Sequence, residues 1–311
     1  MGGTAIVTGG AGFIGSHLVD SLLGDGFRVV VVDDLSSGRA ANLAPEAELV
    51  EADVRDLAAL ERVFASARPR GVFHLAAQSL VPVSLAEPER DLAVNALGTL
   101  QALRAAASVG APLVLASSGA VYGEAALLPT PESAPAAPRS PYGASKLAAE
   151  AYLSVWARSS GLPHAACRLG NVYGPRQPPR AVVPTYSLAL FEGRAPTLLG
   201  HGEKSRDFVH VSDVVAALRA ALGRPGVYNV ATGVETRTRA VFELLRAAAQ
   251  LDVEPELVPL PEGEIERSCL SPELAARALG FRARIPLAEG VPAAYRALAR
   301  EFASAGARQP A

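Results

Sequence analysis

The sequence predicts an α/β protein built on a doubly wound parallel sheet, with a smaller, discontinuous α/β lobe toward the C-terminus. Three observations predict it: a strand runs directly into a glycine-rich turn and a helix near residue 10, short β-rich runs then alternate with helical stretches, and the second half is less regular and richer in Pro and Gly. Alternating β and α elements form parallel sheets that are covered by helices on both faces.

The expected elements follow in chain order. Strands are predicted over about 4–8, 27–33, 47–51, 71–75, 112–116 and 163–168, and helices over 14–24, 56–66, 88–108 and 143–159. After an irregular stretch over 171–206, one further strand is expected at 227–232, with helices in 238–250 and 271–301. We therefore expect a sheet domain from 1–170 plus about 207–232, and a substrate-binding lobe from 171–206 plus about 233–311.

The N-terminal turn indicates a dinucleotide site. The strand enters Gly9-x-x-Gly12-x-x-Gly15, and a helical pattern follows at once. Gly9 permits the tight turn, Gly12 lets a pyrophosphate approach the backbone, and Gly15 allows the helix to pack closely on the strand, with the helix N-terminus toward the phosphates. The second strand ends in Asp33, whose carboxylate suits the adenine ribose diol and would repel a 2′-phosphate. The sheet is thus expected to be of the Rossmann type and to bind NAD rather than NADP.

Tyr142-Gly-Ala-Ser-Lys146 is the second informative feature. A lysine one helical turn after a tyrosine lies on the same face, and its charge favours the phenolate and lowers the tyrosine pKa. A nearby serine hydroxyl, for which Ser118 is the candidate, can pass a proton between phenol and substrate. This is the arrangement that a carbinol needs while a nicotinamide removes its hydride.

The composition disfavours several classes of function. The 311 residues carry a formal charge of −2, so there is no basic surplus for nucleic acid. Cys167 and Cys269 do not suggest a disulfide framework, no apolar run predicts a membrane span, and a strand within four residues of the start leaves no room for a signal peptide. The five histidines show no metal-ligand spacing, so no metal is expected. We expect a cytoplasmic protein.

Taken together, the motifs show a specific resemblance over residues 4 to about 292. The chain resembles the nucleotide-sugar 4-epimerase group of the extended short-chain dehydrogenase/reductase family. The motifs that carry it are Thr8-Gly-Gly-Ala-Gly-Phe-Ile-Gly15, Asp33-Asp34-Leu35, Asp53-Val54, His74-Leu-Ala-Ala-Gln78, Asn95-x-x-Gly98-Thr99, Ser117-Ser118-Gly-Ala-Val-Tyr122-Gly123, Tyr142-x-x-x-Lys146, Arg168-Leu-Gly-Asn171-Val-Tyr-Gly-Pro175-Arg176 and Gly202-Glu-Lys-Ser-Arg206-Asp207-Phe208.

The resemblance implies an NAD-dependent isomerase that inverts C4 of a UDP-hexose through a transient 4-keto sugar. Tyr142 would take the C4 hydroxyl proton, Ser118 would relay it, and Lys146 would lower the Tyr142 pKa. It also implies a homodimer whose protomers pair through a four-helix bundle of residues 90–108 and 143–159. The implied cofactor contacts are Gly9, Gly12, Phe13, Ile14, Gly15, Asp33, Asp34, Leu35, Ser37, Gly38, Asp53, Val54, Leu75, Ala76, Ala77, Gln78, Asn95, Tyr142 and Lys146, and the implied substrate contacts are Ser118, Tyr142, Asn171, Val183, Arg206 and Ser268.

Several residues differ from the motifs of related enzymes, and these differences disfavour some of the possible reactions. Sugar-nucleotide dehydratases place acids directly after the catalytic Ser/Thr, and this chain has Gly119 and Ala120 there, so loss of water is disfavoured. Pro178 stands where hexuronate 4-epimerases carry an arginine, which favours a neutral hexose, and the small Ser268 leaves space for a 2-acetamido group. The turn around Pro261 lacks the second diphosphate-binding arginine of the family, unless Arg267 supplies it.

Several alternatives stay open from sequence alone. The chain could be a UDP-glucuronate 4-epimerase, a nucleotide-sugar oxidoreductase with net NAD turnover, or a non-catalytic dinucleotide sensor. Individual residues also have plainer interpretations: Asp53 could cap the helix near residue 56, Asn95 could simply hold backbone, and Arg168 could be structural.

Overall fold

A seven-stranded sheet forms the centre of the molecule in the computed structural model, which describes residues 2–261 and 264–306. Its strand order is β11-β6-β5-β4-β1-β2-β3, and every adjacent pair is parallel. The strands are β1 (Thr4–Thr8), β2 (Arg28–Asp33), β3 (Glu48–Glu51), β4 (Gly71–His74), β5 (Leu113–Ser118), β6 (Ala165–Leu169) and β11 (Gly226–Val230). The order reverses between β1 and β4, which confirms the predicted doubly wound sheet.

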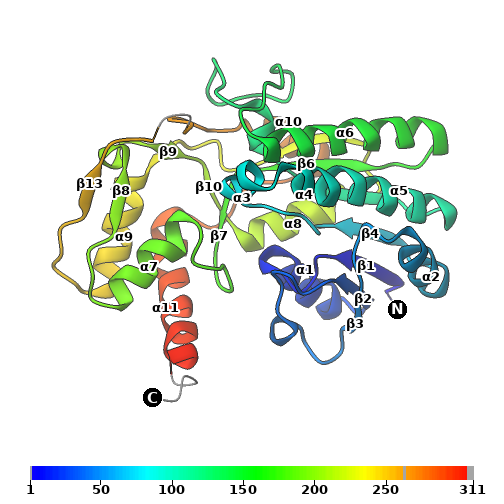
Figure 1. The fold of residues 1–311 in the computed structure, drawn as a ribbon, viewed down its shortest axis with the longest axis horizontal. Helices are drawn as coiled ribbons and strands as arrows, with labels where there is room; N and C mark the ends of the chain where they lie inside the picture. The colour runs from blue at the N-terminus through cyan, green and yellow to red at the C-terminus, as the bar shows by residue number, and fades with distance from the viewer. Residues whose placement is uncertain (1, 262–263, 307–311) are drawn as a thin grey trace.

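Helices cover both faces of this sheet, because its strands are apolar on both sides. One core joins the sheet to α1 (Phe13–Gly24), α8 (Val211–Ala221) and α10 (Glu273–Leu279). The other joins it to α2 (Leu57–Ala67), α5 (Gly98–Ser108) and α6 (Pro141–Ser160). Figure 1 shows the α1–α8 layer and the α5–α6 layer on opposite sides of the sheet.

The helix that carries Tyr142 and Lys146 has well-defined ends. The Ser140 hydroxyl accepts a hydrogen bond from the Gly143 amide at 3.1 Å, and Pro141 occupies the first helical position, where its missing N–H costs nothing. Gly161 ends the helix in the left-handed conformation. Both catalytic candidates therefore lie within the first two turns of a firmly capped helix.

The helix predicted over 88–108 is observed without a break, but it is not α-helical throughout. It consists of α4 (Pro88–Leu92), a π-helical turn η2 (Ala93–Leu97) and α5, and an unpredicted short helix α3 (Val81–Ala86) precedes it. A π-helical turn inserts an extra residue into the helical repeat and is frequent at functional sites. Here the turn contains Asn95.

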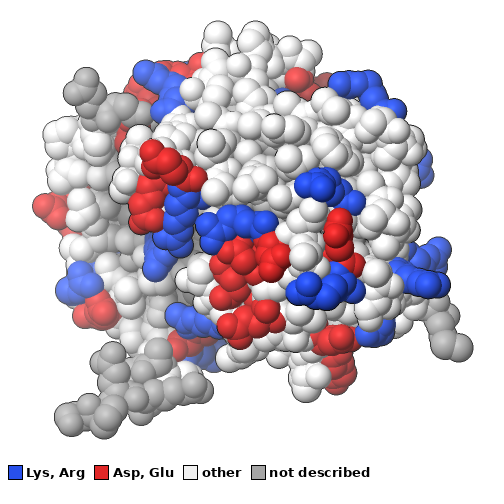
Figure 2. Space-filling view, turned by 45° about the vertical axis from the view of Figure 1, so that its right-hand side comes forward, with Lys and Arg blue, Asp and Glu red and all other residues white. Residues whose placement is uncertain are grey.

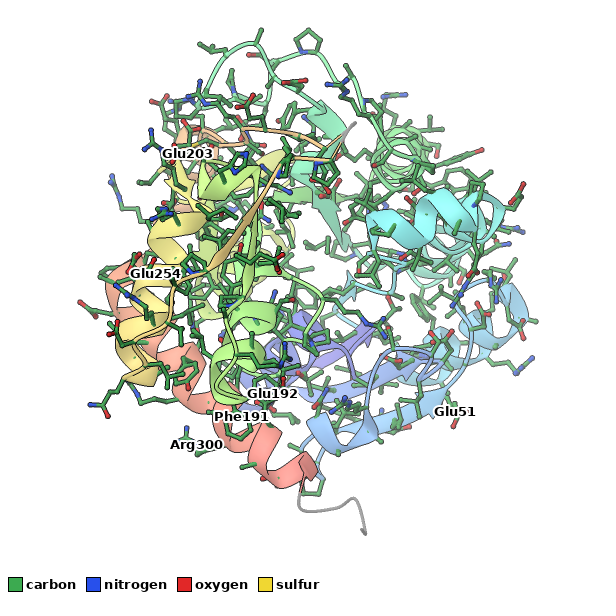
Figure 3. The ribbon with its side chains drawn as sticks, turned by 60° about the vertical axis from the view of Figure 1, so that its left-hand side comes forward. Glu51, Phe191, Glu192, Glu203, Glu254 and Arg300 are labelled. Carbon is green, nitrogen blue, oxygen red and sulfur yellow. The ribbon has the colours of Figure 1, made fainter. Side chains whose placement is uncertain are left out.

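A smaller lobe lies beside the sheet, at the left of Figure 1. Its own apolar core joins α7 (Val182–Phe191), α9 (Thr238–Ala249) and α11 (Leu287–Gly306). Two short strand pairs complete it: β8 (Thr197–Leu199) with β13 (Glu256–Val258), and β9 (Ser205–Arg206) with β12 (Thr236–Arg237). A third pair, β7 (Asn171–Tyr173) with β10 (Phe208–His210), contributes side chains to the sheet core and to the core of the lobe. In Figure 3, Phe191 and Glu192 mark the end of α7 close to Arg300 of α11, and there Phe191 packs on Phe302 with ring centroids 5.7 Å apart.

Short 3-10 turns connect several elements: η1 (Ala40–Asn42), η3 (Gly119–Tyr122) and η4 (Gly200–Gly202). On the face drawn in Figure 2, basic and acidic side chains lie among one another rather than in separate fields. None of the helices in the described part of the chain is both long and apolar enough to cross a membrane.

Candidate active site

The candidate site forms at the carboxyl edge of the sheet, at the reversal point between β1 and β4. The loops after β1, β2, β4 and β5 all begin there, because parallel strands share that edge, and they carry most of the predicted residues. Doubly wound sheets bind their ligands in the crevice at this position.

The glycine turn leaves a backbone cradle that no other residue could maintain. Gly9 has a φ of +70°, and a Cβ there would lie 2.5 Å from the Ala76 amide nitrogen. A Cβ on Gly15 would lie 2.1 Å from the Gly9 carbonyl oxygen. Gly12 is the N-cap of α1 without a side-chain cap, so Phe13 and Ile14 open the helix with amides that have no intrahelical acceptor. These features fit the pyrophosphate of a dinucleotide.

Asp33 ends β2 beside this cradle, where its carboxylate is held by the backbone. Oδ2 accepts from the Ala11 amide and Oδ1 from the Leu35 amide, both at 2.9 Å. Burial raises the pKa of Asp33, and the two backbone hydrogen bonds oppose this. Each oxygen keeps a lone pair for a ribose hydroxyl. The following residues form the rim: Asp34 and Ser37 are exposed, and Leu35 and Gly38 are half-buried.

Asp53 does not cap the neighbouring helix. Asp56 does so, since its carboxylate accepts from the Ala59 amide at 3.0 Å. Asp53 instead binds Arg55 through both carboxylate oxygens, and this hydrogen-bonded pair lowers the pKa of Asp53. Val54 is buried and packs against Gly98. A Cβ built on Gly98 would lie 2.8 Å from the Val54 side chain.

The segment after β4 and the π-helical turn are tied to each other. Leu75, Ala76, Ala77 and Gln78 are half-buried along the cradle. Asn95 is fully buried: its Oδ1 accepts from the Gln78 amide at 2.9 Å, and its Nδ2 donates to the Gln78 carbonyl at 3.0 Å. The Asn95 amide group therefore holds backbone, as its plainer interpretation has it, and any cofactor contact by Asn95 stays a prediction.

Ser118, Tyr142 and Lys146 converge at the end of β5. Burial raises the pKa of Tyr142, while its contact with the Ser118 side chain lowers it. Lys146 is buried and donates to the Ala116 carbonyl at 3.0 Å, and burial lowers its pKa to about 8. The structure does not show the predicted lowering of the Tyr142 pKa by Lys146: burial of the phenol raises this pKa, and the contact that opposes the rise is with Ser118.

A buried ion pair beside α6 was not predicted from the sequence. Glu150, one turn beyond Lys146, accepts from Arg168 Nε at 3.0 Å and Nη2 at 2.6 Å, and also from the Ser117 hydroxyl at 2.5 Å. Arg168 Nη1 donates to the Tyr122 hydroxyl at 2.8 Å. Arg168 is structural, as its plainer interpretation has it, and a carboxylate four residues after Lys146 was the only sequence signal of the pair.

The predicted substrate-binding residues near the boundary with the smaller lobe differ in how exposed they are. Asn171 is exposed at the start of β7, and Ser268 is half-buried beside β9, where its amide donates to the Ser205 carbonyl at 3.3 Å. The Arg206 guanidinium donates to the backbone carbonyls of Ile265 and Glu266, so it also fastens the 264–268 loop. Val183 is 1% exposed and packs in the core of the lobe rather than at its surface, so a substrate contact by Val183 stays a prediction.

Neighbouring charges are paired among themselves. Arg267, the candidate for the second diphosphate-binding arginine, forms a bidentate pair with Glu235 at 2.7 and 2.6 Å. Lys204 contacts Glu264 at 2.5 Å. Glu262 and Gly263, in the turn after Pro261, lie outside the described residues. Over residues 2–261 and 264–306, no cluster of three or more His, Cys, Asp or Glu side chains could hold a metal ion.

Comparisons with known proteins agree with this geometry. The model of the NAD dependent epimerase/dehydratase family matches residues 5–231. A UDP-glucose 4-epimerase of Mycolicibacterium smegmatis is 43% identical over 299 residues, which cover 92% of this chain and 95% of the relative. A crystal structure of a Thermotoga maritima UDP-glucose 4-epimerase with UDP-glucose superposes with a TM-score of 0.94 at 39% identity, covering 96% of this chain and 99% of the other. A Thermus thermophilus UDP-glucose 4-epimerase in complex with NAD gives 0.89 at 40% identity, covering 95% and 98%.

Proposed function

This chain belongs to the NAD dependent epimerase/dehydratase family, and on that premise we propose that it inverts C4 of a UDP-hexose, interconverting UDP-glucose and UDP-galactose. The observation that carries the proposal is the convergence of Ser118, Tyr142 and Lys146 at the end of β5, beside the Gly9–Gly15 cradle. The enzyme is an NAD-dependent nucleotide-sugar 4-epimerase.

The residues fit the cofactor. The cradle and the N-terminus of α1 would hold the pyrophosphate, and the Asp33 carboxylate would accept the adenine ribose hydroxyls. When bound, NAD supplies reversible acceptance of the hydride from C4 of the sugar.

Side chains of the protein itself transfer the proton of the C4 hydroxyl. Burial favours the neutral Tyr142 phenol, and the Ser118 contact counters this effect. Ser118 passes the C4 hydroxyl proton to Tyr142 and returns it after the 4-keto sugar has presented its opposite face. Asn171 and Arg206 would hold the diphosphate.

The structure favours epimerisation over related reactions. Gly119 and Ala120 form the turn after Ser118, so no carboxylate stands there to expel a hydroxyl. The next acid, Glu124, is paired with Arg139 at the surface. The hexuronate alternative is also weakened, since Arg176, one of the arginines that flank Pro178, binds Asp20 at 2.8 Å. The small Ser268 supports acceptance of N-acetylhexosamine forms.

We propose a homodimer that uses the outer face of α5 and α6. Leu97 of η2, directly before α5, is 41% exposed, and Tyr152 and Val155 of α6 are 42% and 47% exposed, whereas Leu103 of α5 is fully buried in the sheet core. Exposed apolar side chains on adjacent helices indicate a surface that another protomer covers. We expect a single dimer by light scattering and a monomer after Tyr152→Glu; a monomeric wild type would refute this part.

The lobe division predicted from sequence is also proposed here, supported by the separate core around α7, α9 and α11. Within 233–311, α10 is the exception, because it packs in the core of the sheet. A cytoplasmic location is proposed from the two free, buried cysteines, Cys167 and Cys269.

The test is to incubate the purified protein separately with UDP-glucose, UDP-N-acetylglucosamine and UDP-glucuronate, without added cofactor, and to resolve the products by anion exchange and proton NMR. We expect the C4 epimer of UDP-glucose. Release of reduced cofactor with net oxidation of the sugar would refute the proposal in favour of an oxidoreductase, and turnover of UDP-glucuronate alone would refute the neutral substrate.

A further inference from the structure

A buried polar cluster lies beneath the first turn of the catalytic helix. Asp91, at the end of α4, is fully buried. Its Oδ2 accepts from the Ser145 hydroxyl at 2.5 Å, and its Oδ1 accepts from Gln78 Nε2 at 2.8 Å and from Asn95 Nδ2 at 3.1 Å. Asn95 Nδ2 also lies 3.0 Å from Ser145 Oγ. Ser145 stands between Tyr142 and Lys146, so this cluster is anchored directly to the catalytic helix.

Within residues 2–261 and 264–306, no cation contacts the Asp91 carboxylate. All three of its side-chain donors are neutral groups, and an ionised carboxylate, which only accepts, suits all three. Among the ion pairs of the described residues, none includes Asp91. A buried charge is normally balanced by an opposite one nearby.

Lys146 is the opposite case, a buried positive charge that is hydrogen-bonded to a neutral group. Its ammonium is buried, and its hydrogen-bond partner is the neutral Ala116 carbonyl. The carboxylate next to it on the same helix, Glu150, is already matched by the bidentate contact with Arg168. His74 of β4 adds no negative charge, since it is held between the hydroxyls of Thr8 and Thr99.

We propose that Asp91 is a positioning residue of the active site: its carboxylate is the buried counter-charge of Lys146, and through Ser145 it fixes the turn that joins Lys146 to Tyr142. The π-helical turn serves this arrangement, because it places Asn95 so that one amide group bonds Gln78, Asp91 and Ser145 together. The inference rests on the proposed function only in taking Tyr142 and Lys146 as the catalytic pair.

The electrostatic consequence has a definite sign. The Asp91 charge raises the pKa of Lys146 and also that of Tyr142. The other ionisable groups that face the pair are Glu150 of α6, which raises the pKa of Lys146, and His74 of β4, whose pKa is lowered to about 3 by burial and by Lys146. His74 therefore stays neutral over the working range, and Glu150 is shared with Arg168. Removing the Asp91 charge should move both proton losses of the Tyr142–Lys146 pair to lower pH.

The ammonium can be titrated directly, without any turnover. The chain has only two lysines, Lys146 and Lys204, so lysine labelled with heavy nitrogen at Nζ gives two NMR signals, which Lys204→Arg assigns. We expect Asp91→Asn to lower the titration midpoint of Lys146 by about one pH unit, the usual size of a lost neighbouring charge. An unchanged midpoint in folded Asp91→Asn protein would overturn the proposal. If that variant does not fold, the smaller Asp91→Ser carries the same test.

Kinetics separate charge from mere packing. With UDP-glucose, Asp91→Asn should lower kcat about tenfold or more at the wild-type optimum, leave KM within about twofold, and shift the kcat–pH profile to lower pH. Ser145→Ala keeps the charge and loses the hydrogen bond, so kcat should fall without a shift of the profile. Glu87→Gln, at the exposed start of α4, is the matched control and should match the wild type.

A loss of kcat in Asp91→Asn with the profile unmoved would show a purely structural role and would overturn the counter-charge. Failure of the proposed function is distinguishable, because then the wild type itself leaves UDP-glucose unchanged, while the Lys146 titration still reports on Asp91.

Discussion

Replacing Glu150 by glutamine should destabilise the protein strongly, although the substitution changes neither shape nor size. The side chains of Arg168 and Glu150 are 9% and 5% exposed, and three donor contacts of 2.6 to 3.2 Å join them. Glu150→Gln leaves the Arg168 charge buried without its partner, which costs about 3–5 kcal/mol. For a chain of this size that is a fall in melting temperature on the order of 10 °C.

The matched control is the same substitution in an exposed pair. Arg28 and Glu48 are 54% and 50% exposed, so Glu48→Gln should cost about 1 kcal/mol or less. Both variants are measured by thermal unfolding with circular dichroism and by urea titration. If Glu150→Gln lost no more stability than Glu48→Gln, the Glu150–Arg168 pair would not be the buried structural link that supports the catalytic helix.

Four further results are expected. Tyr142→Phe should reduce kcat about 10²–10⁴-fold, the usual worth of one acid–base group, with NAD still retained on gel filtration, and near-normal turnover would contradict the proton route. Because burial raises the pKa of Tyr142, wild-type kcat should climb with pH on its acid side, where a flat profile would be inconsistent with a phenolate base. Gly15→Ala should abolish NAD retention and lower the melting temperature, because the new Cβ would lie 2.1 Å from the Gly9 carbonyl oxygen, and a variant that binds NAD normally would disprove the close approach. Below pH 6.5 stability should fall, since His74 is held neutral with a pKa of about 3 and the unfolded chain binds that proton first; at pH 5 the loss is about 2 kcal/mol, measured by urea titration, and His74→Asn should flatten it.

The sheet could be predicted from sequence because each strand is a short apolar run bounded by glycine or polar residues. The strands predicted over 4–8 and 47–51, for example, are observed as Thr4–Thr8 and Glu48–Glu51. Three helices, α3, α7 and α8, were not predicted. Residues 182–191 fall in the stretch over 171–206 that the sequence predicts to be irregular, yet Pro184 lies in the first turn of α7, where proline is tolerated. The π-helical turn escaped because nothing within 93–97 breaks the helical pattern.

The candidate site likewise contains residues that the sequence predicts and residues that it does not. Gly9, Asp33, Tyr142 and Lys146 follow strands or share a helix face, so spacing along the chain brings them together. Asp91 did not stand out, since Glu89-Arg90-Asp91 has the composition of a solvated face. It is buried because α3, α4 and α6 pack around it, and such long-range packing leaves no local pattern.

The most direct test of the central claim uses UDP-glucose carrying deuterium at C4. If C4 is oxidised and then receives the same hydride on its opposite face, the UDP-galactose formed must keep the deuterium at C4, and kcat should fall by a primary isotope effect. Proton NMR of the product reads this in one spectrum. Loss of the label to water would mean that C4 is inverted by proton exchange, and the roles of Ser118, Tyr142 and Lys146 in hydride-coupled proton transfer would be wrong.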